Sequence, residues 1–233
     1  MDPKKVKVSI AKFKSEPRKT FFAPEYNYTI FETEVQQVNF QNLAKLILSK
    51  EKLILQLPTS TVAKDAYTGL NENSTTQRFD KYNVLKWEDE TVESLKGNII
   101  NFHNGIMQYF KLPIPKELYV QCWVNIMRKG EQIKPHIHDI GPNCYLGGHI
   151  CVQCDDTSTH YINPINQIND PMLYSSKNEV GKMTIFPNNV PHYTDIHNSD
   201  SERITLAFDI FPENPATLKE SQNLHAGNYL KIV

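Results

Sequence analysis

Three histidines in the second half of the chain have the residue type and the spacing of a metal site. His136 and His138 are separated by one residue in the run 135–139, and His192 follows a later apolar segment. In an extended chain, side chains at i and i+2 project to the same face, so both imidazoles could reach one metal ion, with a third nitrogen from His192. Facial sets of this kind, commonly two His and one carboxylate, hold non-haem iron and leave positions open for other ligands.

The place of His138 in this site has more than one solution. Asp139 is the nearest carboxylate, but in an unbroken strand it points away from the face shared by His136 and His138. Asp139 could bind the metal only if the chain turned after His138. His138 could also act through a hydrogen bond that orients a true ligand. The residues alone therefore leave both His138 and Asp139 as candidates.

Arg203 and Thr205 are the candidates for binding a carboxylate. They begin the run RITLAFDIF, and their i, i+2 spacing puts a guanidinium and a hydroxyl on one face of a strand. That pair suits a fork of hydrogen bonds to a carboxylate. If His192 holds the metal, a neighbouring strand would place Arg203 deeper in the same barrel. A dicarboxylate such as 2-oxoglutarate could then bind the metal at its keto-acid end and Arg203 at the other.

The elements that must position these residues divide the chain into a helical part and a β-rich part. Alternation over residues 5–13 predicts a strand. Helical spacing after Asn39, which can serve as N-cap, predicts a short amphipathic helix, and the same spacing over 92–109 predicts a longer one. Residues 57–86 are polar and lack either period, which predicts a long loop that could act as a lid.

Short apolar segments separated by turns follow residue 113, at the spacing of an all-β sandwich or barrel. We expect one domain over 1–233, with a helical support region at 1–112 that includes the N-terminal strand and the long loop. The β part at 113–212 would carry the site. The tail at 213–233 could pack on the domain, swap to a partner or remain loose.

Composition narrows the partners and the location. Lys and Arg number 25 against 26 Asp and Glu, so no global field steers the protein toward nucleic acid, which we consider an unlikely partner. The sequence has neither a signal-peptide core nor a membrane span, and we expect a cytoplasmic protein, in the host cytoplasm if the source is viral. Cys151 and Cys154 form a C-x-x-C motif inside a strand-like run without a second pair, which favours reduced thiols over a zinc site.

The order of the motifs over roughly residues 118–212 resembles the 2-oxoglutarate- and iron(II)-dependent oxygenases found in bacteria and tailed phages, relatives of prolyl and aspartyl hydroxylases. The motifs are, in order, W-x-N from Trp123, P-H-x-H from Pro135, the glycine-containing strand Leu146 to Ile150, F-P-x-x-x-x-H ending at His192, and R-I-x-L-A-F from Arg203. Each motif is short, so the likeness depends on their order and on the distance from the histidine to the arginine.

This resemblance implies a mainly β fold, a double-stranded β-helix (jelly-roll, cupin-like) barrel with N-terminal helices. It implies iron(II), 2-oxoglutarate and O₂ as cofactors, metal binding by His136 and His192, and binding of the far carboxylate of 2-oxoglutarate by Arg203 and Thr205. The family usually carries Asp or Glu where this chain has His138. The third ligand is therefore His138, water, or Asp139.

The activity implied is that of a dioxygenase that hydroxylates an unidentified substrate, with a protein side chain such as proline, aspartate or asparagine as the family-based expectation. One alternative is a cupin-like metal-binding protein that uses the same histidines without 2-oxoglutarate. Another is a phage structural or assembly module in which the histidine cluster is incidental, because fold does not imply function.

Overall fold

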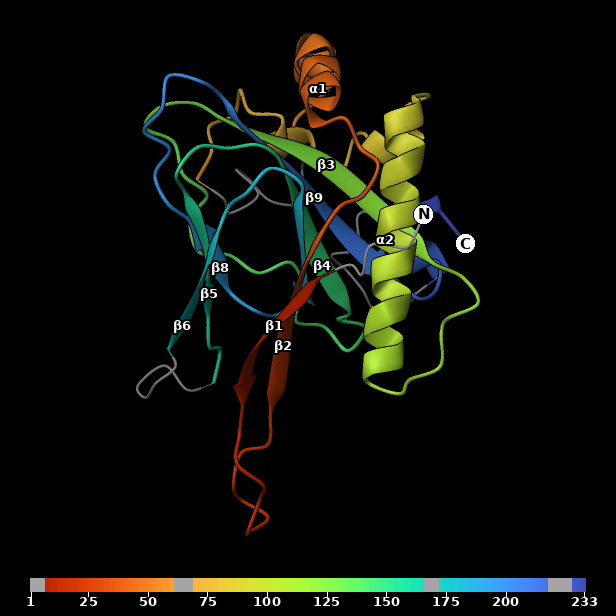
Figure 1. The fold of residues 1–233 in the computed structure, drawn as a ribbon, viewed down its shortest axis with the longest axis vertical. Helices are drawn as coiled ribbons and strands as arrows, with labels where there is room; N and C mark the ends of the chain where they lie inside the picture. Colours follow the sequence, from red (N-terminus) through yellow and green to blue (C-terminus); the bar gives the residue numbers. More distant parts are fainter. Residues whose placement is uncertain (1–6, 61–68, 166–171, 218–227) are drawn as a thin grey trace.

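Two antiparallel β-sheets form the frame of the molecule, and helices cover one of them (Figure 1). The computed structural model describes residues 7–60, 69–165, 172–217 and 228–233. The larger sheet has seven strands in the order β1-β2-β7-β4-β9-β3-β10, and the smaller has three in the order β6-β5-β8. In chain order the strands are β1 (Val8–Lys14), β2 (Asn27–Glu34), β3 (Tyr119–Met127), β4 (Leu146–Gln153), β5 (Ser158–Ile162), β6 (Leu173–Lys177), β7 (Lys182–Pro187), β8 (His192–Thr194), β9 (Arg203–Phe211) and β10 (Leu230–Lys231).

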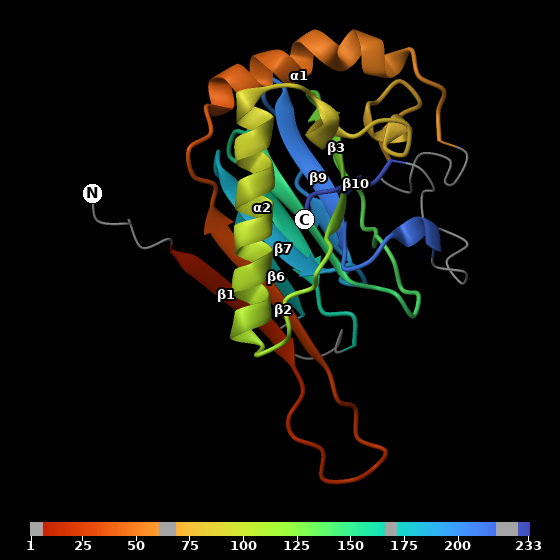
Figure 2. The same cartoon turned by 90° about the vertical axis from the view of Figure 1, so that its right-hand side faces the viewer.

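The helices α1 (Phe40–Leu55) and α2 (Glu90–Tyr109) pack on the side of the large sheet that faces away from the small one (Figures 1 and 2). Both begin at a side-chain cap. Asn39 accepts a hydrogen bond from the backbone N–H of Asn42, and Asp89 accepts one from Thr91. Both helices and the Asn39 cap are thus confirmed. Neither helix is long and apolar enough to cross a membrane, among the residues that the structure describes.

Strand β9 lies in the middle of the large sheet, paired with β4 on one side and β3 on the other. All of its residues are buried. The alternate residues from Ile204 to Ile210 join the hydrophobic core shared with α1 and α2. The opposite set, which includes Arg203, Thr205 and Asp209, faces the small sheet. The strand therefore has one face for folding and one face toward the space between the sheets.

The predicted N-terminal strand is confirmed as β1, but β2 was not predicted. β2 pairs with β1 on one side and β7 on the other, so the N-terminal segment is part of the large sheet. Residues Thr29 to Thr33 of β2 are buried in succession, because the strand is covered on both faces. A strand buried on both faces lacks the alternation of apolar and polar residues that identifies a half-buried strand. The predicted mainly β, jelly-roll fold with helices is confirmed.

The long polar loop predicted at 57–86 is in large part packed structure. Residues 61–68 lie outside the described chain, but the rest holds the 3₁₀ turns η2 (Thr76–Arg78) and η3 (Val84–Lys86) and many buried side chains. The hydroxyl of Thr75 donates to the carbonyl of Val124 at 2.7 Å, and that of Thr76 donates to Oδ1 of Asn125 at 2.7 Å. The hydroxyl groups of this segment thus form hydrogen bonds with buried polar groups of β3.

The C-terminal tail packs on the domain at its far end. Leu230 and Lys231 form β10, which pairs with Val120 and Tyr119 of β3. Of the arrangements considered for the tail, packing is the one that the described residues adopt; residues 218–227 lie outside the described chain.

Candidate metal centre

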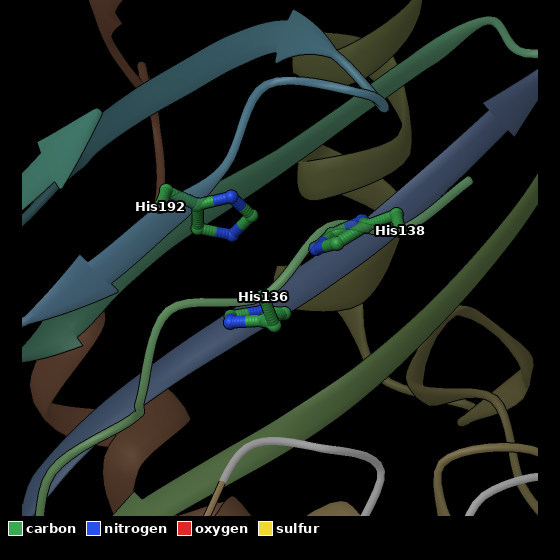
Figure 3. Close-up of side chains that lie close together, drawn as sticks. All are labelled: His136, His138 and His192. Carbon is green, nitrogen blue, oxygen red and sulfur yellow. The ribbon is translucent and has the colours of Figure 1, made fainter. Parts of the chain in front are cut away.

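Three histidines meet in the space between the sheets (Figure 3). His136 and His138 lie on the segment before β4, and His192 is the first residue of β8. One ring nitrogen from each lies within 4.8 Å of the others. The ring centroids are 4.3 Å apart for His136 and His192, 5.1 Å for His138 and His192, and 5.6 Å for His136 and His138. The structure thus brings together all three histidines that the sequence singled out.

The segment that carries His136 and His138 is extended but is not the strand that the sequence suggests. It meets β8 in a single bridge, in which the backbone N–H of each of His136 and His192 donates to the carbonyl of the other, at 3.1 and 3.0 Å. The N–H of His138 donates instead to Asn188 at 2.9 Å. This bridge and the hydrogen bond from the N–H of Thr194 to the carbonyl of Ile133, at 3.0 Å, join the segment to β8 on the side of His192.

Backbone carbonyls set the orientation of two of the rings. Nδ1 of His136 lies 2.9 Å from the carbonyl oxygen of Lys134, and Nδ1 of His192 lies 3.0 Å from that of Val190. A carbonyl can only accept, so Nδ1 carries the proton in both rings and Nε2 keeps a free lone pair. Metal-binding histidines usually have this second hydrogen bond, because it fixes the tautomer and the ring plane.

Burial and mutual repulsion keep these rings neutral. Desolvation, followed by the charge of His138, lowers the pKa of His136 to about 4. Desolvation, followed by the charges of His136 and His138, holds the pKa of His192 well below its usual value. At neutral pH both rings therefore offer a lone pair to a metal and no positive charge to repel one.

His138 is oriented by a carboxylate that the sequence analysis did not single out. Its Nδ1 lies 2.5 Å from Oδ1 of Asp209, across 71 residues of sequence, and both side chains are largely buried. The alternation of β9 gave a clue, because Asp209 follows Arg203 and Thr205 at even spacing and so shares their face. The sequence could place Asp209 on that face but could not pair it with His138.

Gly147 leaves the room in which His138 is held. A Cβ atom at this position would lie 2.8 Å from Nδ1 of His138 and closer still to Oδ1 of Asn188. Asp209 is the cross-strand partner of Gly147. A glycine is required here because any side chain would displace the ring or the amide.

Asp139 does not join the histidine cluster. Its Oδ1 accepts the backbone N–H of Gly141 at 2.8 Å, and its own N–H donates to the carbonyl of Asn188 at 3.3 Å. The chain does turn after His138, as metal binding by Asp139 would require. The carboxylate of Asp139, however, accepts a hydrogen bond within this turn.

Arg203 is a buried guanidinium without an anionic partner among the described residues. Its residue is 2% exposed, Nη1 donates to the sulfur of Met127 at 3.2 Å, and Nε has no hydrogen-bond partner. None of the ion pairs of the described residues includes it. Desolvation lowers its pKa from the usual value, yet an arginine remains charged. Thr205, also buried, lies two residues further along the same face.

His149 lies between the two ends of this inner face. Desolvation first, then the charges of Arg203 and His138, lower its pKa to about 3. Its Nε2 lies 2.8 Å from the hydroxyl of Tyr161, and its Nδ1 has no partner among the described residues. The polar residues of this inner face on β4 and β9 are His149, Arg203, Thr205 and Asp209, and we call this set the polar strip.

Comparisons with known proteins agree with this geometry. Residues 121–209, from β3 to β9, match the model of a family described as "Putative 2OG-Fe(II) oxygenase". A Pseudomonas putida prolyl-4-hydroxylase superimposes with a TM-score of 0.51 at 10% identity, covering 75% of this chain and 86% of that one. EvdMO1 superimposes with a TM-score of 0.50 at 14% identity, covering 79% of this chain and 47% of that one. No curated protein sequence matches significantly. At these identities the two structures show a shared fold, and the family match covers every site residue described above.

Proposed function

We propose that this chain is a 2OG-Fe(II) oxygenase, which the family match of residues 121–209 supports, and that it holds iron(II) with His136, His138 and His192 and hydroxylates a C–H bond. Arg203 and Thr205 would bind the far carboxylate of 2-oxoglutarate. Imidazole nitrogens suit iron(II), and three of them on one side leave the remaining positions open for the cosubstrate and oxygen.

The observation that carries this proposal is the buried guanidinium of Arg203 on the same inner face as the histidine cluster. An unpaired buried charge is unfavourable, and a carboxylate that forks onto it removes that penalty. 2-Oxoglutarate has one carboxylate for Arg203 and a keto-acid group for the metal.

Iron(II) with O₂ supplies the oxidising chemistry: 2-oxoglutarate gives succinate and carbon dioxide, one oxygen atom enters succinate and the other enters the substrate C–H bond. The chain's own residues bind and orient. The carbonyls of Lys134 and Val190 hold two imidazoles in the ligating tautomer, and Arg203 fixes the direction of the cosubstrate. Holding the reacting groups close together and in the right orientation is a large part of what a protein contributes to such a reaction.

For the substrate we propose a protein side chain, with proline, aspartate or asparagine as the first candidates. The support is the family resemblance and the fold shared with a protein named as a prolyl-4-hydroxylase. Succinate release from 2-oxoglutarate, measured over peptides that contain these residues and over a pool of small metabolites, separates this proposal from oxidation of a metabolite. A peptide product that carries one oxygen atom from ¹⁸O₂ supports it; turnover with metabolites alone contradicts it.

The cofactor assignment is tested by anaerobic titration of the iron(II)-loaded protein with 2-oxoglutarate, following the visible charge-transfer band. The wild type should form the band, and His192→Ala should lose it because it loses iron. Arg203→Met should bind iron within about twofold of wild type but need on the order of 100-fold more 2-oxoglutarate, the size expected for a lost buried charge pair. His160→Asn, which changes a histidine that hydrogen-bonds Ser175 and Asp195 outside the cluster, is the matched control.

The outcomes of this titration separate the alternatives. Iron binding without a band in the wild type would favour a cupin-like metal protein that does not use 2-oxoglutarate. Absence of iron binding would leave the cluster with a structural role. Equal losses of iron and 2-oxoglutarate in Arg203→Met would argue against the role assigned to that residue.

A further inference from the structure

We propose that Asp209 is a positioning residue for the metal: it supplies, through His138, the negative charge that a carboxylate ligand supplies directly in the usual facial set. The inference rests on the proposed metal site and adds to it a residue that explains how His138 can stand where Asp or Glu is usual.

The geometry puts Asp209 behind the ring of His138. Its Oδ1 lies 2.5 Å from Nδ1, and the side chains of His138 and Asp209 are only 6% and 10% exposed. The two nitrogens of an imidazole point to opposite sides of the ring, so a carboxylate at Nδ1 leaves Nε2 free to face the metal. Asp209 therefore contacts the candidate metal site through the ring of His138.

The charge of Asp209 is directed to this ring and to no cation. Among the ion pairs of the described residues, Asp209 takes part in the one with His138 alone. A short hydrogen bond from N–H to a carboxylate in a buried site is of the strong, charge-assisted kind. It fixes the tautomer and the plane of the ligand. The carbonyls that accept from His136 and His192 are neutral, so His138 is the one ring of the three oriented by an acid.

The surroundings hold the pair in place. Gly147, which has no Cβ, gives space beside Nδ1 of His138, and Trp123 and Phe186 place their rings 5.7 and 5.8 Å from that of His138, centroid to centroid. Asp209 itself is fixed on β9, the central strand. The hydrogen bond is thus built into rigid elements, as a positioned ligand requires.

Counting charge shows why the acid belongs here. A divalent ion bound by two His and one carboxylate carries one net positive charge, whereas three neutral imidazoles leave it with two. With Asp209 hydrogen-bonded to His138, the ion and its ligands again sum to one positive charge. The carboxylate thus lies at Nδ1 of His138, the histidine that stands in the position of the usual carboxylate ligand, and not at the metal itself.

A double-variant experiment separates this role from a merely structural hydrogen bond. Affinity for cobalt(II) and nickel(II) is measured by calorimetry on the full chain, with the visible bands of the cobalt form recorded alongside. Asp209→Asn keeps the shape and removes the charge, and should weaken binding 10- to 100-fold and shift the cobalt bands. Asp195→Asn, which removes the same charge from the other histidine–aspartate pair, His160 with Asp195 at 2.9 Å, should change neither.

The decisive arm is His138→Asp, which restores a carboxylate ligand at the usual position. In that background Asp209 faces a second carboxylate, so Asp209→Asn should leave the metal affinity unchanged or raise it: the sign of the effect reverses. A role of Asp209 that does not pass through His138, such as support of β9, would give the same loss in both backgrounds. If Asp209→Asn does not fold by circular dichroism, the smaller neutral variant Asp209→Ser takes its place.

The inference and the proposed function fail in different ways. A wild type that binds neither metal overturns the metal site itself. A wild type that binds both metals with an affinity that Asp209→Asn leaves unchanged overturns only the role of Asp209. Loss of binding in the single variant with reversal in the His138→Asp background supports both.

Discussion

Both faces of β9 are buried, but one carries apolar side chains and the other carries polar ones. On one face Ile204, Leu206, Phe208 and Ile210 pack into the core under the helices. On the other, Arg203, Thr205 and Asp209 belong to the polar strip, and Asp209 contacts His138 of the histidine cluster. Burial on the first face supplies folding free energy. Burial on the second leaves polar atoms, such as Nε of Arg203, without hydrogen-bond partners among the described residues.

Unpartnered atoms mark the second face. Nε of Arg203, Nδ1 of His149 and both amide atoms of Asn188 are buried without hydrogen bonds to described residues. A buried polar atom left without a partner costs about 1–3 kcal/mol, so a sheet face that carries several is unfavourable for folding until something binds there. Sites of this kind keep function at the expense of stability.

The largest change should come from the apolar face. Leu206 is fully buried between Val124 of β3 and Ile150 of β4. Leu206→Ala should lower the free energy of unfolding by about 3 kcal/mol, through the lost transfer energy and the cavity left behind. The metal affinity of the folded protein should stay within about twofold of wild type, as measured by urea unfolding and cobalt(II) titration. Loss of metal affinity without loss of stability would contradict the conclusion that this face of β9 supports folding rather than the metal site.

A middle-sized effect should come from pH acting on the polar face. The pKa of His149 is lowered to about 3, from 6.5, so below pH 6.5 the unfolded chain binds a proton that the folded chain does not. Stability is therefore fully present above pH 6.5 and falls as the pH drops toward 3, by roughly 1 kcal/mol per pH unit from this residue. Urea unfolding of the metal-free protein at pH 7 and pH 5 should show a loss to which His149 contributes about 2 kcal/mol, and His149→Gln should reduce the loss by that amount. His136 and His192, whose pKa values are also lowered by burial, account for a further part that the variant keeps. An equal loss in that variant would assign the effect to other groups.

The smallest effect should have the opposite sign. Arg203→Met removes a desolvated charge that has no anionic partner in the ligand-free protein. We expect the free energy of unfolding to rise by about 1 kcal/mol in the absence of 2-oxoglutarate. Added 2-oxoglutarate should then stabilise the metal-loaded wild type but not the variant, in thermal unfolding. A clear loss of stability without the ligand would mean that Arg203 also supports the fold.

Local pattern predicted the elements whose two faces differ. The Asn39 cap and the apolar spacing of α1 and α2 are visible in a short window, because each helix has one buried side. The alternation over residues 5–13 predicted the strand β1 but not its burial, because Val8 and Ile10 are exposed and only Phe13 is buried. Strand β2 was missed because neighbours on both sides of it bury successive residues. The polar segment after residue 69 was misjudged because its hydroxyls bond buried groups of β3, such as the carbonyl of Val124, that no window contains.

By itself the sequence determined the chemical types at the site and the face on which each lies, because the period of an extended chain relates His136 to His138 and Arg203 to Thr205 directly. It could not determine which of these side chains meet. The bridge between His136 and His192, the turn that occupies Asp139, and the contact of His138 with Asp209 across 71 residues all follow from how the strands are ordered. Strand order is decided by the burial of whole faces against each other, and that is a property of the tertiary structure rather than of any local run of residues.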